Sequence, residues 1–286
     1  MDAIAEKETP GGPFPRREYA ARQRLVRERT AERGLDGLLI ADPANLFYLT
    51  GYNAWSFYMP QLLYVPVDGE PLLMMREMDA NGAYRTAVGI GRDRILGYPE
   101  SLIHQRDAHP GEWMAKQLLD AGPGAGLRVG YEGEAHFLTP RLLGSLSRAL
   151  SGWALTDCND LVNWVRVVKS DAEIELMRAA GKVCGAVMRA GLAALAPGRP
   201  QHEVAAEILA AQARGTDGVD GDYPAIVPLL PTGAGADTPH LTWSAAPLPV
   251  GEPISLEIAG AHHRYHAPLA RTAIIGRMRL PPPLIM

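Results

Sequence analysis

The strongest candidate for a chemically active side chain is Glu257, which lies in the short segment 254–258 (ISLEI). Apolar and polar residues alternate there, which predicts a strand with one apolar face and a second face that presents Ser255 and Glu257 together. A carboxylate on a central strand is costly to bury without partners, so it is either exposed on an edge strand or placed for use. If it is placed for use, it could activate a water molecule or attack an electrophilic carbon directly, and the pattern favours neither.

His240 is the second candidate. It ends the glycine-rich segment 233–240, which follows an apolar run over 225–230. The preceding Pro239 restricts how the backbone approaches the histidine. An imidazole titrates near neutrality and could move protons in an active site, but a single histidine in a loop is also a common surface residue. The loop alone leaves both interpretations open.

Three histidines, His262, His263 and His266, cluster after Glu257. Histidine and glutamate are ordinary zinc ligands. However, the spacing matches no standard zinc pattern, and the first two histidines fall in the predicted turn between two strands, so we predict no metal site. His266, on the strand opposite Glu257, is a candidate hydrogen-bond partner for a substrate carboxylate. Arg271, farther along that strand, could pair with a carboxylate beside the site or bind a carboxylated substrate through its planar head.

The bulk composition narrows the functional class. The chain has 286 residues, 47% of them hydrophobic, and a formal net charge of −4. This balance gives no reason to expect a nucleic acid or an anionic membrane as partner. No apolar run is long enough to span a bilayer. The two cysteines cannot form a disulfide framework, and residues 1–15 lack the apolar core of a signal peptide, so we expect a cytoplasmic protein with a mobile N-terminal tail.

The N-terminal half shows an alternation of helix and strand signals that is typical of an α/β domain. Asp68-Gly69 is a strong hairpin signal between two of the strands. The predicted helices cover 16–32, 113–119 and 140–150, and the predicted strands cover 37–41, 62–67, 72–75 and 128–131.

A second part of the chain begins near residue 166. Ser170 and Glu173 have the spacing of a capping box, which predicts a helix start. An inward-facing stripe is predicted along this helix at steps of three and four residues, namely Ile174, Met177, Gly181, Cys184, Met188 and Leu192. The small residues Ala180, Gly181 and Gly185 would let another element approach closely, and Pro200 opens a second helix.

Four motifs together resemble the creatinase/aminopeptidase P ("pita-bread") family. They are the segment 45–51 (NLFYLTG), the segment 169–178 (KSDAEIELMR), Pro239-His240, and Glu257 followed by Arg271-Thr272. The resemblance implies an α/β fold in which a creatinase-type N-terminal α/β domain (16–165) precedes the first half of an α+β pita-bread catalytic domain (166–286).

The resemblance also implies an activity. Metal-dependent members carry two aspartates eleven residues apart; here the first position is Glu257, and counting forward by eleven gives Pro268, which has no ligand atom. The chain therefore resembles the metal-free branch, which hydrolyses C–N bonds in small molecules without a cofactor. In that family the histidine of the Pro-His motif moves protons. The motifs around Tyr52 and Glu257 imply a small cyclic amidine that carries a carboxylate as the substrate.

Family members of the creatinase type form homodimers, in which the N-terminal domain of one subunit closes the pocket of the other. This implies a homodimer here as well. The aromatic cluster of Tyr52, Trp55, Phe57 and Tyr58 could then provide a cation–π wall for an amidinium ring, with Tyr52 and Trp55 as candidate substrate-binding residues. Such a cluster is also typical of an ordinary core.

The family's catalytic domain has two related halves, and the second supplies a further histidine and two carboxylate positions. This sequence ends at Met286 after three successive prolines. We therefore expect an inactive, truncated form. Two alternatives remain: a metal-dependent X-Pro aminopeptidase, and a non-catalytic chain that serves as a dimerisation partner.

Overall fold

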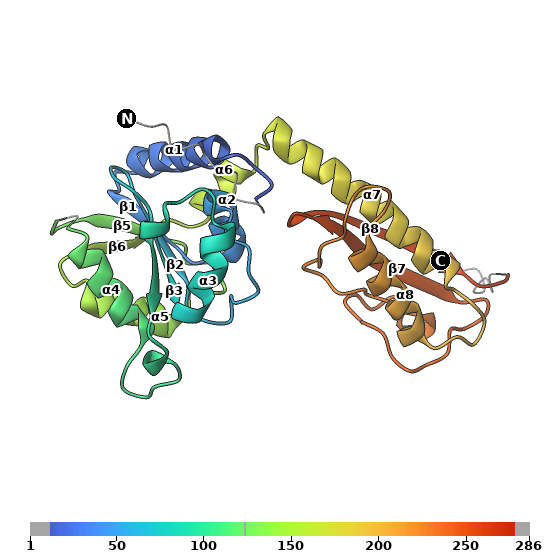
Figure 1. Cartoon of the computed structure of the whole chain (residues 1–286). Coiled ribbons are helices and arrows are strands. Elements are labelled where there is room, and N and C mark those ends of the chain that lie inside the picture. Colours follow the sequence, from blue (N-terminus) through green and yellow to red (C-terminus); the bar gives the residue numbers. More distant parts are fainter. Residues whose placement is uncertain (1–11, 123, 278–286) are drawn as a thin grey trace, which may run out of the picture. The chain divides into compact units, whose positions relative to one another are not determined.

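The computed structural model describes residues 12–122 and 124–277, and it divides into two units between Val168 and Lys169 (Figure 1). The sequence placed this boundary between residues 165 and 166. Most of the tail predicted over residues 1–15, and the prolines after residue 280, lie outside the described residues. No helix in the described part of the chain is both long and apolar enough to cross a membrane.

The first unit is built on a six-stranded mixed sheet with the order β4-β3-β2-β1-β5-β6. Its strands are β1 (Gly37–Ile40), β2 (Leu62–Pro66), β3 (Leu72–Arg76), β4 (Ile95–Tyr98), β5 (Arg128–Tyr131) and β6 (Ala154–Asp157). Strands β1, β5 and β6 run parallel to one another, whereas β2 is antiparallel to both β1 and β3. The β2–β3 pair confirms the hairpin predicted at Asp68-Gly69.

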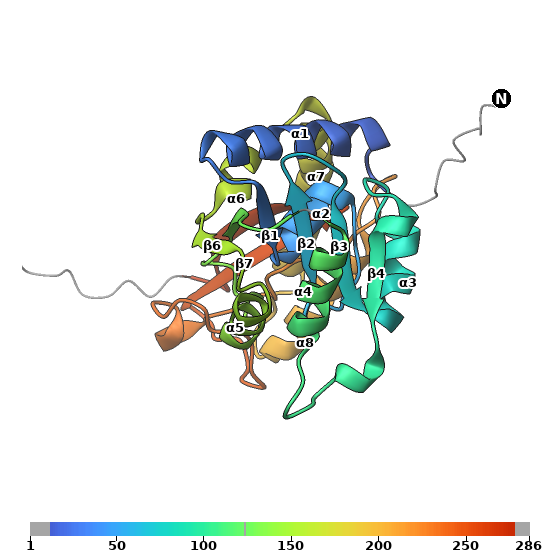
Figure 2. The same ribbon diagram turned by 90° about the vertical axis from the view of Figure 1, so that its left-hand side faces the viewer.

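Helices cover both faces of this sheet. Alternate strand residues point to opposite sides, and both sets are apolar, so each face needs a covering layer. Leu38 and Ile40 of β1 belong to one apolar cluster, and Leu39 between them belongs to the other. The first cluster includes residues of α1 (Arg16–Glu32), α2 (Pro43–Thr50), α3 (Glu77–Thr86) and α6 (Leu161–Arg166). The second includes residues of α4 (Pro110–Asp120) and α5 (Pro140–Ala149), and Figure 2 looks onto this side of the sheet. The three-layer arrangement confirms the predicted α/β class.

The second unit packs two helices, α7 (Asp171–Ala193) and α8 (Gln201–Arg214), against a hairpin of β7 (Pro253–His262) and β8 (Tyr265–Ile274). The predicted capping box is present at the start of α7, where Ser170 accepts from the backbone of Glu173 and the Glu173 carboxylate accepts from the backbone of Ser170. The other oxygen of Glu173 accepts a hydrogen bond from the hydroxyl of Tyr265 at 2.7 Å. One buried side chain therefore caps α7 and binds the start of β8.

The buried stripe of α7 differs in part from the predicted one. Its apolar and small members are Ala180, Val183, Cys184, Val187, Met188 and Gly191. Gly181 and Leu192, which the periodicity predicts to face inward, are exposed. The prediction follows the helix period correctly but is rotated around the axis, because several faces of this helix are apolar.

The expected close approach between α7 and a neighbour occurs at a different place. A Cβ atom added to Gly260 of β7 would lie 2.2 Å from the backbone nitrogen of Cys184 and 2.6 Å from the carbonyl oxygen of Ala180. By contrast, nothing lies within 4 Å of a Cβ added at Gly181, and Gly185 meets only the side chain of Arg189. The glycine that permits the contact therefore belongs to the strand and not to the helix.

Candidate active site

Glu257 lies on a strand that is paired on both sides. Its N–H group donates to the carbonyl oxygen of Leu229 at 3.1 Å, and its own carbonyl accepts from Leu229 at 2.9 Å. On the other side, Glu257 is opposite Ala270 of β8. The inward-pointing Ile254, Leu256 and Ile258 are fully buried, as the alternation predicted. The backbone of Glu257 is thus held rigidly while its carboxylate remains exposed to solvent.

His240 is carried by a loop that begins directly after the segment paired with β7. Residues 229–232 bridge to β7 at both ends, through Leu229 with Glu257 and Thr232 with Ile254. The chain then makes a single 3₁₀ turn at Gly233–Gly235 and returns, so that the N–H of Leu230 donates to the carbonyl oxygen of Leu241 at 3.0 Å. His240 is exposed and has a φ of 67°, a left-handed conformation that is uncommon for a residue other than glycine.

Three of the predicted site residues, His240, Glu257 and Arg271, line an open hollow of about 610 Å³. Residues 236–240 form one wall of the hollow, and the facing parts of β7 and β8 form another. Arg271 is exposed there, and its guanidinium donates to the carbonyl oxygen of Ala270 at 2.7 Å. A carboxylate, an imidazole and a guanidinium therefore border one space, which is a set of groups suited to proton transfer and to binding of an anionic substrate.

The sequence analysis missed several polar neighbours in this hollow. Thr272 stands opposite Ser255 in the hairpin register, with their hydroxyl oxygens 3.4 Å apart, and Asp237 and Thr238 precede the histidine on the loop wall. The strand alternation could have placed Thr272 near the site only if the hairpin register had been known.

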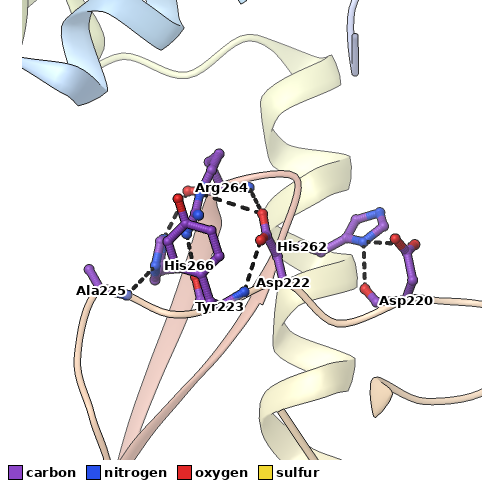
Figure 3. A network of polar contacts seen from close by, with 7 residues as sticks. All are labelled: Asp220, Asp222, Tyr223, Ala225, His262, Arg264 and His266. Atoms are coloured by element: carbon purple, nitrogen blue, oxygen red, sulfur yellow. Dashed lines mark hydrogen bonds and ion pairs between the residues drawn. The ribbon is translucent and has the colours of Figure 1, made fainter. Parts of the chain in front are cut away.

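His266 is not among the residues that line the hollow. It lies near the turn of the hairpin, in the network of polar contacts that Figure 3 shows. In the β7–β8 register it pairs with Ala261, whereas Glu257 pairs with Ala270. Its Nδ1 contacts the carbonyl oxygen of Arg264 at 2.8 Å, and its Nε2 accepts from the N–H of Ala225 at 2.9 Å. Because a carbonyl can only accept and an N–H can only donate, this geometry fixes the neutral tautomer protonated on Nδ1. Both ring nitrogens are thus engaged with the backbone, which differs from the substrate contact expected for this residue.

The same end of the hairpin carries further charged groups. Arg264 donates its backbone N–H to the carboxylate of Asp222 at 3.0 Å and lies over the ring of Tyr223 at 3.6 Å from the centroid. His262 contacts the carbonyl oxygen of Asp220 through Nδ1 at 2.9 Å. Burial lowers the pKa of both His263 and His266. These contacts tie the segment after α8 to the hairpin, and they give the histidine cluster a structural role.

Tyr52 and Trp55 lie in the first unit and have different environments. Tyr52 is only 4% exposed, and its hydroxyl contacts the hydroxyl of Ser56 at 2.6 Å and accepts from Gln61 at 3.2 Å. Its ring is therefore part of the core and presents no free face. Trp55 is 63% exposed and packs edge-on against Phe57, so its ring is accessible.

The donor groups at this site do not fit the metal pair of the metal-dependent relatives. Pro268, at the second ligand position, is exposed beside Ala259 and offers no side-chain donor. We therefore derive no step through a metal.

Comparison with known proteins agrees with this architecture. Residues 22–168 match the creatinase/prolidase N-terminal domain, and residues 175–283 match metallopeptidase family M24. The chain belongs to the creatinase/M24 family. The sequence resemblance to this family is thus confirmed, and with it the predicted succession of a creatinase-type domain and pita-bread elements.

Two relatives show how similar this chain is to known proteins of the family. The chain is 42% identical to an ectoine hydrolase of Halomonas elongata over 271 residues, which cover 93% of this chain and 67% of that protein. It is 37% identical to an uncharacterised hydrolase/peptidase, y4tM, of Sinorhizobium fredii over 92% of this chain and 67% of that protein. The chain therefore spans about two thirds of the length of these relatives. Its family is one of hydrolases.

Solved structures show the same fold. A prolidase of Thermococcus sibiricus superposes with a TM-score of 0.76 at 17% identity, covering 91% of this chain and 66% of the prolidase chain. At this identity the likeness concerns the fold alone.

Proposed function

We propose that this protein hydrolyses a C–N bond in a small cyclic amidine of the ectoine type, without a metal ion. The observation that carries the proposal is the meeting of Glu257, His240 and Arg271 at one hollow in a chain that is 42% identical to an ectoine hydrolase. Pro268 supports the metal-independent form, because it stands where the metal-dependent relatives need a second bridging carboxylate.

Each of the three groups has a role in the proposed reaction. Ectoine is a cyclic amidine that carries a carboxylate, and hydrolysis adds one water molecule and opens the ring to an acetylated diaminobutyrate. Glu257 attacks the amidinium carbon or removes a proton from the attacking water, and His240 delivers a proton to the nitrogen that leaves that carbon. Arg271 pairs with the substrate carboxylate through its planar guanidinium.

The proposed assembly is a homodimer in the cytoplasm, and the resemblance to the creatinase type is the reason for expecting a dimer. The exposed ring of Trp55 supports a role for the N-terminal domain in binding a cationic amidinium ring of the substrate held by a partner subunit. Sedimentation equilibrium measures the dimer directly. A Trp55→Ala variant should raise KM for ectoine with little change in kcat, and an unchanged KM would remove Trp55 from the proposal.

The decisive experiment is ectoine hydrolysis in the presence of a chelator. The chain would be assayed as given and also joined to the remaining third of the Halomonas elongata relative, with acetylated diaminobutyrate detected by mass spectrometry. We expect no turnover by the chain as given, in line with the inactive form that the sequence resemblance implies. We expect turnover in the joined protein that persists in EDTA and is lost in a Glu257→Gln variant. Ectoine turnover that requires added Mn²⁺ or Zn²⁺ would refute metal independence, and release of the N-terminal residue from X-Pro peptides would instead indicate an aminopeptidase.

The same protein can distinguish the two roles open to Glu257. If Glu257 attacks directly, acid quenching during turnover should leave a peptide containing Glu257 that is heavier by the bound substrate. If Glu257 activates water, no such adduct forms: the water adds to the amidinium carbon, and the tetrahedral intermediate then breaks its bond to one ring nitrogen, which takes a proton from His240.

A further inference from the structure

The loop that carries His240 is joined at both ends to a single buried side chain. We call residues 232–244 the His240 loop. Gln201, the first residue of α8, is 7% exposed. Its amide Nε2 donates to the hydroxyl of Thr232 at 2.7 Å, and its Oε1 accepts from both the N–H of Ser244 at 3.0 Å and the Ser244 hydroxyl at 3.1 Å. One amide therefore bridges the first and last residues of the loop.

The start of α8 adds backbone contacts to the same end of the loop. The N–H of Gln201 donates to the carbonyl oxygen of Ala246 at 3.0 Å, and the N–H of His202 donates to that of Ser244 at 3.1 Å. The first N–H groups of a helix have no partners within the helix, and here the carbonyl oxygens of Ser244 and Ala246 accept from them. The opposite end is held near β7, where Thr232 bridges to Ile254.

Between these anchors the loop is held by backbone hydrogen bonds within its first turn and by one from the N–H of Leu230 to the carbonyl oxygen of Leu241 at 3.0 Å. Residues 236–242 are mostly exposed, and glycines occupy positions 233 and 235. His240 nevertheless has a left-handed φ of 67°. Such a backbone conformation persists in a non-glycine residue only when its surroundings enforce it. Fixing both ends of the loop restricts the conformations that it can adopt. The side-chain amide of Gln201 fixes both ends at once.

We propose that Gln201 is a positioning residue that holds the His240 loop closed and so sets where His240 stands in the hollow. The inference rests on the proposed function for its kinetic consequence, but the anchoring of the loop can be measured without any substrate. A glutamine suits the task because its amide supplies a donor for Thr232 and an acceptor for Ser244.

The variant Gln201→Met tests the anchor, because methionine has a similar length and cannot make these hydrogen bonds. Gln212→Met is the matched control. Gln212 lies on the same helix, is 2% exposed, and donates to the carbonyl oxygen of Ala259 instead of the loop. We expect amide hydrogen exchange over 232–244 to rise about tenfold in Gln201→Met, with no change there in Gln212→Met. Equal exchange in the two variants would overturn the proposal.

A kinetic cycle tests the positioning role. In the completed enzyme, Gln201→Met should lower kcat by about tenfold to a hundredfold, since small displacements of a catalytic group have effects of this size, while KM changes little. The same substitution in a His240→Ala background should lower kcat less than about twofold, because residues that act as a unit are not additive. An equal loss in both backgrounds would show that Gln201 acts by another route.

Two further outcomes are covered by the design. If Gln201→Met does not fold, Thr232→Val removes one partner of the amide with little change in volume, and it should raise loop exchange in the same direction. If ectoine proves not to be a substrate, the proposed function fails, whereas faster loop exchange in Gln201→Met still supports the anchor and unchanged exchange still refutes it.

Discussion

Glu132 allows a sharp prediction about how pH affects the stability of the first unit. This glutamate follows β5 and is 3% exposed. Its Oε1 accepts from the side-chain amide of Asn45 at 2.6 Å. Burial, reinforced by the nearby carboxylate of Asp42, raises the pKa of Glu132 to about 7, and hydrogen bonds from the amide of Asn45 and from the backbone of Asp42 and Ala41 offset only part of this.

The size of the effect follows from the difference in pKa between the folded and the unfolded chain. Glu132 has an ordinary pKa of 4.5 when unfolded and about 7 when folded. A tenfold change in proton affinity corresponds to about 1.4 kcal/mol, so ionisation of Glu132 costs the folded state about 3 kcal/mol. Below pH 4.5 the group is protonated in both states and carries no penalty. The penalty grows as pH rises from 4.5 to 7 and is complete above pH 7, because only the unfolded chain releases the proton easily.

The perturbation is Glu132→Gln, and the assay is urea unfolding at pH 5 and pH 8.5, monitored by tryptophan fluorescence. Four tryptophans, Trp55, Trp113, Trp153 and Trp164, report on the first unit. The natural protein should lose about 2.5 kcal/mol more than Glu132→Gln between the two pH values, because part of the penalty is already present at pH 5. The introduced amide can leave a buried donor unpaired, which costs about 1–3 kcal/mol, but that cost is the same at both pH values.

Glu134→Gln is the control, since Glu134 is an exposed carboxylate close by in the sequence. It should leave the pH dependence of unfolding unchanged. If Glu132→Gln and the natural protein lose the same stability between pH 5 and pH 8.5, then Glu132 is ionised at little cost, and the reasoning from burial is wrong.

Three further substitutions test the second unit. Gly260→Ala should lower the unfolding free energy by about 1–3 kcal/mol or more in denaturant titrations, because the added Cβ would lie 2.2 Å from the backbone of Cys184. A variant as stable as the natural protein would show that the strand and the helix can move apart without cost. Ser170→Ala removes the cap of α7 and should cost about 1 kcal/mol in the same measurement, and a loss below about 0.3 kcal/mol would deny the capping box any role. Arg271→Lys should raise KM for ectoine about tenfold while kcat changes little, because lysine cannot bind a carboxylate through a planar fork; an unchanged KM would exclude Arg271 from substrate binding.

Local patterns in the sequence determined much of this protein. The alternation over 254–258 correctly predicted a strand whose apolar residues are buried and whose carboxylate faces outward. The spacing of Ser170 and Glu173 correctly predicted where α7 begins. These features depend on residues a few positions apart, so strand period and helix capping could be read directly from the chain.

Only the tertiary structure decided which of the candidate residues share one space. His240 and Arg271 border the hollow beside Glu257, whereas His266 is engaged by the backbone of Ala225 and Arg264. The hairpin register separates these residues, and no local pattern specifies that register.

Burial and close contact were likewise settled by distant segments. The ring of Tyr52 is buried and has no accessible face, because residues from other elements pack around it. Gly260, rather than the glycines of α7, permits the helix to approach the strand, and Gln201 bridges two residues that are 31 and 43 positions away in the chain. These contacts join segments that are far apart in the sequence, so they form only when the chain is folded and no local sequence pattern predicts them.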